Sequence, residues 1–119
     1  DIRRRTAKRS SLSLKLRDSI PDWVSPGQAD NEDPALIAQD WAAIRNTMWN
    51  YVGITRTPPR LARAVDDMRR LYKNLSDFYK RTPPSKALVD LFHGCQAGYS
   101  VTLSAMRNPK SLGCHYRVD

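Results

Sequence analysis

Hydrophobic residues recur every three or four positions in three long stretches of the chain, and this spacing predicts three amphipathic helices. The first runs from about Pro34 to Val52, the second from Pro58 to the residue before Thr82, and the third from Pro83 to Asn108. The residues expected to face the core are Ile37, Trp41, Ile44, Met48 and Val52, then Leu61, Val65, Met68, Tyr72, Leu75 and Tyr79, then Leu88, Leu91 or Phe92, Cys95, Tyr99, Thr102 or Leu103, and Met106.

Each predicted helix starts with a polar residue followed by proline: Asp33-Pro34, Thr57-Pro58-Pro59 and Thr82-Pro83-Pro84. A polar cap accepts a hydrogen bond from the first turn, and proline lacks an N–H where none is needed. Gly53 is expected to end the first helix in the left-handed conformation. Because links of a few residues favour antiparallel neighbours, we expect an all-α, antiparallel up-down-up three-helix bundle.

The residues before the first helix show no sustained periodicity. Residues 11–16 alternate like a short strand, and residues 21–34 are rich in turn formers. We interpret residues 1–32 as an extended arm and linker, with Trp23 and Val24 as an apolar anchor, and residues 33–119 as the helical domain with a short C-terminal tail.

The arm carries much of the positive charge. Residues 1–18 contain seven Lys or Arg against two Asp, a net charge of +5 out of +8 for the whole chain. A basic arm beside a nearly neutral domain is typical of nucleic-acid-binding proteins. It is also what the cut edge of a larger protein looks like, and we favour this second interpretation because short basic runs are usually solvated surface.

Composition excludes several classes of protein. With 40% hydrophobic residues, most of the 119-residue chain should fold. The longest run without Asp, Glu, Lys or Arg, Leu91 to Met106, is shorter than the ~20 apolar residues that a membrane span needs. No apolar signal-peptide core is present. Cys95 and Cys114 are too few for a disulfide framework or a metal site of recognisable spacing. We expect a cytoplasmic location and no membrane partner.

No nucleotide-binding glycine loop or nucleophile motif occurs in the chain. His93 and Cys95 are two positions apart on a helix and should face different sides, so they are not expected to share a ligand. Asp66 and Asp67 are expected to pair with arginines at helical spacing. The sequence therefore assigns no catalytic, cofactor-binding or metal-binding residue.

Two features remain unexplained by a core. Trp49 and Tyr51 flank the apolar stripe of the first helix, which favours a surface that is covered by something else. The tail, residues 111–119, reads SLGCHYRVD. We favour a docking strand or a frayed end for it. Alternatively, His115 or Arg117 reaches into a site that is built mostly by another part of the protein.

The stretch WAAIRNTMWNYVGITRTPPRLARAVDDM, residues 41–68, resembles the C-terminal helical domain of the L-aspartate oxidase family. The tail resembles the family's Ser-Ala-x-x-Arg-x-Glu-Ser-Arg-Gly-x-His-(Phe or Tyr) ending. The matching residues are Trp41, Ile44, Arg45, Met48, Trp49, Tyr51, Val52, Gly53, Ile54, Arg56, Arg60, Leu61, Ala64, Ser104, Ala105, Ser111, Gly113, His115 and Tyr116. Leu112 and Lys110 depart from the family's arginine and glutamate, so any role of that arginine is lost or reassigned.

The resemblance implies a parent enzyme that uses FAD to oxidise L-aspartate to iminoaspartate in de novo NAD biosynthesis. The family's FAD fingerprint and catalytic residues belong to earlier domains, so no FAD is expected on this chain itself. The expected partners are the flavin-binding and capping domains of the same polypeptide. The candidate interface residues are Trp49, Tyr51, Arg56, His115, Tyr116 and Arg117.

Two alternatives stay open. The flavoprotein subunits of succinate dehydrogenase and fumarate reductase share the helical bundle and the tail, although the string Met-Trp-x-Tyr-Val-Gly-Ile favours the oxidase. A second alternative, from another class, is a basic helical module that binds RNA or DNA through residues 3–17 and the arginines of the second helix. Such binding would weaken steeply with salt. The favoured interpretation has no nucleic-acid partner.

Overall fold

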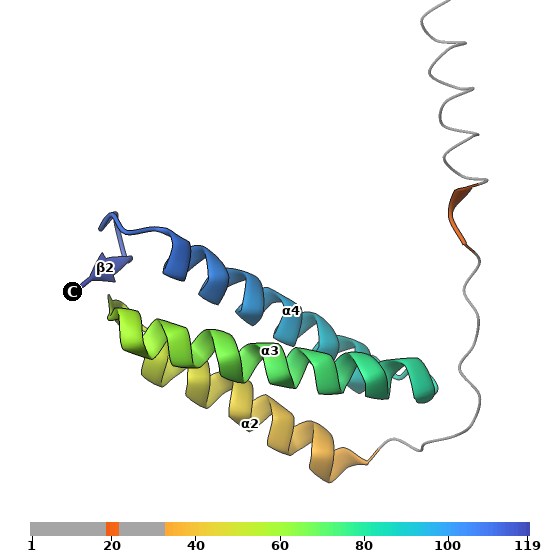
Figure 1. Cartoon of the computed structure of the whole chain (residues 1–119). Helices are drawn as coiled ribbons and strands as arrows, with labels where there is room; N and C mark the ends of the chain where they lie inside the picture. The colour runs from red at the N-terminus through yellow and green to blue at the C-terminus, as the bar shows by residue number, and fades with distance from the viewer. Residues whose placement is uncertain (1–18, 22–32) are drawn as a thin grey trace, which may run out of the picture.

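The computed structural model describes residues 19–21 and 33–119. Its helices are α2 (Pro34–Tyr51), α3 (Pro58–Arg81) and α4 (Lys86–Arg107). Two short strands, β1 (Thr55–Arg56) and β2 (Tyr116–Arg117), pair in parallel. The predicted all-α class with three packed helices is confirmed (Figure 1). The expectations for the basic arm, for residues 11–16 and for Trp23 and Val24 lie outside the described residues.

Each helix packs against both of the others. In Figure 1, α2 leads to the end of the bundle where the strands lie, α3 runs back from that end, and α4 returns to it. The C-terminus of α2, the N-terminus of α3, the C-terminus of α4 and both strands therefore share one end of the bundle. We call this the tail end. Across the described helices, no segment is both long and apolar enough to span a lipid bilayer.

The bounds of α2 are close to those predicted, but the conformation that follows its end is not. Asp33 Oδ1 accepts a hydrogen bond from the Ala35 N–H at 2.9 Å, and Pro34 occupies the first turn. The expected left-handed Gly53 is wrong, because Gly113 is the one described glycine with positive φ. Gly53 is instead constrained by space: a Cβ there would lie 3.0 Å from the Trp49 carbonyl oxygen.

The predicted start of the third helix is also wrong. Helix α4 begins at Lys86, where Ser85 Oγ accepts from the Leu88 N–H at 3.1 Å. Thr82 instead ends α3, because its N–H donates to the Phe78 carbonyl at 3.0 Å. A residue before proline is biased away from helical conformation, so Pro83 and Pro84 fall in the connection. Thr57 does precede α3, although its side chain makes no capping hydrogen bond.

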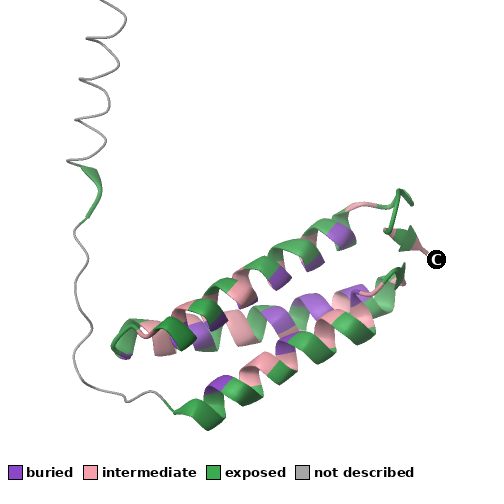
Figure 2. Ribbon diagram, turned by 180° about the vertical axis from the view of Figure 1, so that it is seen from behind, coloured by how far each residue is buried: buried purple, intermediate pink, exposed green. Residues whose placement is uncertain are grey.

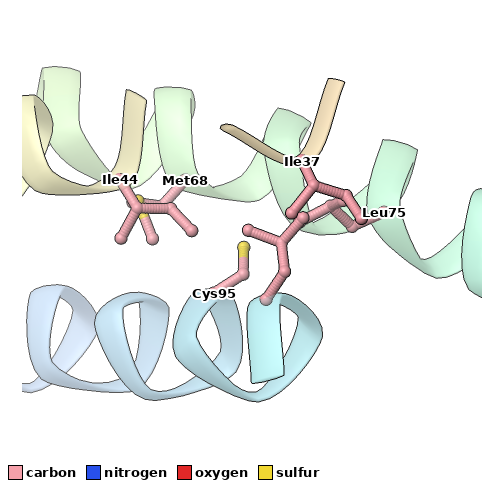
Figure 3. Packing of buried hydrophobic residues seen from close by; sticks show 6 residues of the cluster. Ile37, Ile44, Met68, Leu75 and Cys95 are labelled. Carbon is pink, nitrogen blue, oxygen red and sulfur yellow. The ribbon is translucent and has the colours of Figure 1, made fainter. Parts of the chain in front are cut away.

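The core forms two clusters along the bundle. The larger takes side chains from all three helices (Figure 3) and contains Ile37, Ile44, Met68, Leu75, Leu91 and Cys95. The smaller lies toward the tail end and contains Val52, Leu61, Ala64 and Ala105. Figure 2 shows the buried residues on the inner sides of the helices, as the spacing predicts.

The buried stripe of α4 departs from expectation at two positions. Gly98 is buried, whereas the expected Tyr99 is half-buried and packs against the larger cluster. Met106 is exposed, and Ala105 is buried in its place. Buried positions in this helix are separated alternately by three and four residues, so the step after Thr102 falls on residue 105. The small alanine side chain lies in the same cluster as Leu61 and Ala64 of α3.

Candidate functional site

The C-terminal tail is fixed to the connection between α2 and α3. Strand β2 pairs with β1 so that Thr55 lies opposite Tyr116, and Arg56 opposite Arg117. The Tyr116 N–H donates to the Ile54 carbonyl at 3.1 Å, and the Val118 N–H to the Arg56 carbonyl at 2.9 Å. The tail is therefore a docked strand, the first of the two interpretations that its sequence allows.

A tight turn precedes this strand. Leu112 and His115 exchange two backbone hydrogen bonds, of 3.0 and 2.9 Å. Gly113 has a φ of 56°, a left-handed conformation that costs a side-chain-bearing residue about 1–2 kcal/mol. The turn brings the His115 ring back to the end of α4, where its Nε2 lies 2.9 Å from the Asn108 carbonyl oxygen.

The His115 ring joins the two strands to α4. Arg56 Nη1 lies 2.8 Å from His115 Nδ1. Because arginine can only donate, Nδ1 must accept this hydrogen bond. The ring proton therefore sits on Nε2 and is donated to the Asn108 carbonyl. His115 is thus the neutral Nε2–H tautomer, held at both nitrogens.

Two arginines bind the C-terminal ends of two helices. Arg56 Nε donates to the Gly53 carbonyl at 2.8 Å, and its Nη2 to the Val52 carbonyl at 3.4 Å, at the end of α2. Arg117 Nη1 donates to the Ala105 and Met106 carbonyls, at 3.2 and 3.1 Å, at the end of α4. A cation at a helix C-terminus is stabilised by the helix dipole. Both arginines therefore fix the shape of the tail end.

Exposed apolar side chains also occur at the tail end. Trp49 is 84% exposed, Ile54 is 67% exposed, and Tyr116 is also exposed. The exposure of Trp49 agrees with its position beside the apolar stripe. Tyr51, which the sequence predicts on the same exposed surface as Trp49, is instead half-buried and packs on the smaller core cluster.

Sequence reasoning missed several residues of this region. The sequence pattern indicates Asn108 only as a helix stop, yet its carbonyl accepts hydrogen bonds from His115 and, at 3.3 Å, from Arg117. Ser111 Oγ accepts from the Arg117 N–H at 3.0 Å. A backbone acceptor leaves no side-chain signal, so Asn108 could not be found from residue types. Exposed Ile54 could be found from the sequence, because it is an apolar residue that lies outside the helical stripes.

The remaining candidate groups do not assemble a reaction centre in the described part of the chain. His93 is exposed and Cys95 is buried, on different sides of α4 as predicted. Burial, with a smaller contribution from the Asp40 carboxylate, raises the pKa of the Cys95 thiol to about 11, which makes it a poor nucleophile. No group of three or more metal-ligating side chains occurs within the described ranges.

Comparison with known proteins places this arrangement in a family. Residues 41–119 match the family described as fumarate reductase flavoprotein C-term. The chain is 35% identical over 101 residues to L-aspartate oxidase of Acinetobacter baylyi and 34% identical over 102 residues to that of Pseudomonas aeruginosa. It is 35% identical over 106 residues to that of Halobacterium salinarum.

These alignments cover 85–86% of this chain but only 19–21% of each relative, so the chain spans about a fifth of the length of the curated relatives it matches. The resemblance that residues 41–68 and the tail carry is confirmed. The chain belongs to the fumarate reductase flavoprotein C-terminal family.

Proposed function

We propose that this chain is the C-terminal domain of an L-aspartate oxidase-like enzyme, in which FAD oxidises L-aspartate to iminoaspartate for de novo NAD biosynthesis. The observation that carries the proposal is identity of about a third, across most of the chain, to proteins named L-aspartate oxidase. A cytoplasmic location is part of the same proposal.

Support of the rest of the enzyme is the role we assign to the helical domain. Polar groups of the tail end bind within the domain: Arg56, His115 and Arg117 bind backbone carbonyls or one another. They shape the tail end, while Trp49 and Tyr116 supply an exposed apolar surface. In this proposal, the rest of the enzyme covers these exposed apolar side chains.

We assign no FAD-binding site to the described residues. Dinucleotide sites use a strand followed by a glycine-rich turn and the N-terminus of a helix. Here both strands are two residues long, and β1 is followed by Thr57 and two prolines. We therefore assign FAD to the preceding part of the polypeptide, whose end and linker would correspond to residues 1–32.

A comparison of flavin absorbance between the full polypeptide and the 119-residue chain tests the proposal directly. The full polypeptide should show the visible absorbance of a flavin, and L-aspartate should bleach it. The 119-residue chain, purified from the same cells, should carry no flavin. Flavin bound stoichiometrically to the short chain would overturn the supporting role, and bleaching by succinate but not by L-aspartate would overturn the oxidase.

The flavoprotein subunit of succinate dehydrogenase or fumarate reductase is the second candidate. The description of the matched family favours it. Such a subunit works with an iron–sulfur partner, so co-purification of an iron–sulfur protein with the full polypeptide would select this candidate over the oxidase.

The structure gives the nucleic-acid alternative no added support. Residues 3–17 lie outside the described ranges, and arginines of α3 are paired with aspartates. Asp67 binds Arg63 and Arg70, and Asp66 lies 3.8 Å from Arg69. These pairs follow the predicted helical spacing. Nucleic-acid titrations at two salt concentrations should show no affinity even at the lower one.

A further inference from the structure

We propose that the tail end binds an acidic surface of the remaining polypeptide, and that one carboxylate of this surface pairs with Arg56. The inference rests on the proposed function, since it takes the flavin-bearing part of the same polypeptide as the partner. The relatives supply the length for such a partner, because the chain matches only 19–21% of each of them.

Positive charge is concentrated at the tail end. Residues 53–60 and 104–119 contain five cationic side chains, Arg56, Arg60, Arg107, Lys110 and Arg117, against one carboxylate, Asp119, a net charge of +4. These two segments meet through the β1–β2 pair. A partner surface of opposite charge is favoured at such a patch, because complementary charge steers association and fixes orientation.

Several cations of this patch have no ionic partner within residues 33–119, and Arg56 is the half-buried one among them. Its three hydrogen bonds go to neutral acceptors, namely two carbonyl oxygens and the His115 imidazole. Arg117, by contrast, lies 3.8 Å from Asp119. A guanidinium has five N–H donors, so Arg56 keeps two for a further acceptor. A carboxylate forms the stronger, charge-assisted bond there.

The surface beside Arg56 has room for that carboxylate. An open hollow of about 370 Å³ is lined by Arg56, Ser100, Ser104, Asn108 and His115, with Val101 exposed beside them. Ser104 Oγ already donates to the Ser100 carbonyl at 2.8 Å. Ser100 is exposed, and its hydroxyl can donate a second hydrogen bond to an entering carboxylate. The hollow therefore offers polar groups within a lining that is mostly apolar.

Zero-length cross-linking with a carbodiimide tests the pairing in the full polypeptide. In the Arg56→Lys variant an amine replaces the guanidinium and lies beside the expected carboxylate. The reagent joins an amine to a carboxylate only when the two are in contact. We expect a cross-linked peptide that joins residue 56 to an Asp or Glu outside residues 33–119. Arg70→Lys, exposed on α3 and outside this patch, is the matched control and should give no peptide that joins residue 70 to an Asp or Glu outside residues 33–119.

A second variant guards against loss of folding in Arg56→Lys. Ser104→Lys adds an amine at the hollow and leaves the hydrogen bonds of Arg56 intact, and it should cross-link to the same acidic segment. Absence of cross-links from both positions, or cross-links confined to residues 33–119, overturns the pairing. If Trp49 is nevertheless covered in the full polypeptide, only the Arg56 pairing fails and the supporting role stands.

Discussion

Arg56 donates from Nη1 to Nδ1 of His115 across 2.8 Å, although the two residues are 59 positions apart. The bond closes the tail end, since Arg56 also binds the carbonyls that follow α2 and His115 binds the carbonyl that follows α4. One histidine thus connects the tail to both helices. Its contribution to stability should exceed that of an ordinary surface residue.

Replacement of His115 by alanine should lower the free energy of unfolding by about 1–3 kcal/mol, because two hydrogen bonds are lost and part-buried Arg56 loses an acceptor. Urea denaturation followed by circular dichroism measures the change. His93→Ala is the matched control, because His93 is exposed and surface substitutions usually stay within ~0.5 kcal/mol. Equal effects of the two substitutions would show that His115 does not hold the tail.

The tautomer of His115 is open to direct observation. Long-range proton–nitrogen NMR spectra should show the neutral ring with its proton on Nε2, because Nδ1 accepts from Arg56. In Arg56→Leu this restriction is removed, and the Nδ1–H tautomer should become detectable. A wild-type spectrum dominated by Nδ1–H would contradict the Arg56 contact.

Gly94 allows α4 to approach α2 closely. A Cβ at this position would lie 2.4 Å from Cη2 of the Trp41 ring. Gly94→Ala should therefore destabilise the fold by about 1–3 kcal/mol through overpacking, even though alanine favours helix by about 1 kcal/mol. Thermal denaturation compares it with Gly98→Ala, whose Cβ would meet the flexible end of Met68 at 2.9 Å. The Gly94 variant should be the less stable of the two.

The two thiols should differ sharply in reactivity. Cys114 is exposed and should react with a disulfide reagent at once, whereas buried Cys95 should react only as fast as the bundle opens. Comparison of Cys95→Ala with Cys114→Ala assigns the fast and slow phases. Two fast phases in the native chain would contradict the packing of Cys95.

Cys95 also makes stability depend on alkaline pH. Its pKa is raised from 9.0 to about 11 in the folded chain, so the folded state holds its proton more tightly than the unfolded state. The contribution of the protonated thiol to the free energy of unfolding is fully present below pH 9.0 and is lost as the pH rises to about 11. Denaturation midpoints should fall more steeply across this window in the wild type than in Cys95→Ala.

The helices and most of the core follow from the sequence, because residues such as Ile37, Ile44, Leu61 and Leu75 recur with the period of a helix and need only local spacing to be placed. Local signals predict the wrong helix boundary at Thr82, because this residue could either end α3 or begin α4. Thr82-Pro83-Pro84 has the same form as Thr57-Pro58-Pro59, but Thr82 is already bound to the last turn of α3.

The tail end was only partly predictable for a different reason. A docked strand was one of two interpretations of residues 111–119, yet its register against β1 depends on hydrogen bonds between distant backbone groups. No local pattern indicates that Arg56 meets His115. The family resemblance identified both residues as candidates, and the structure shows which groups they contact.

The rate at which Trp49 is oxidised in radical labelling tests the central claim, that the rest of the enzyme covers the tail end. Trp49 is 84% exposed in this chain and should be oxidised rapidly in the 119-residue protein. In the full polypeptide its oxidation should slow severalfold, while exposed Leu36 and half-buried Trp41, which lie in α2 away from the tail end, serve as internal references. Equal rates for Trp49 in both proteins would contradict a supporting role for this surface.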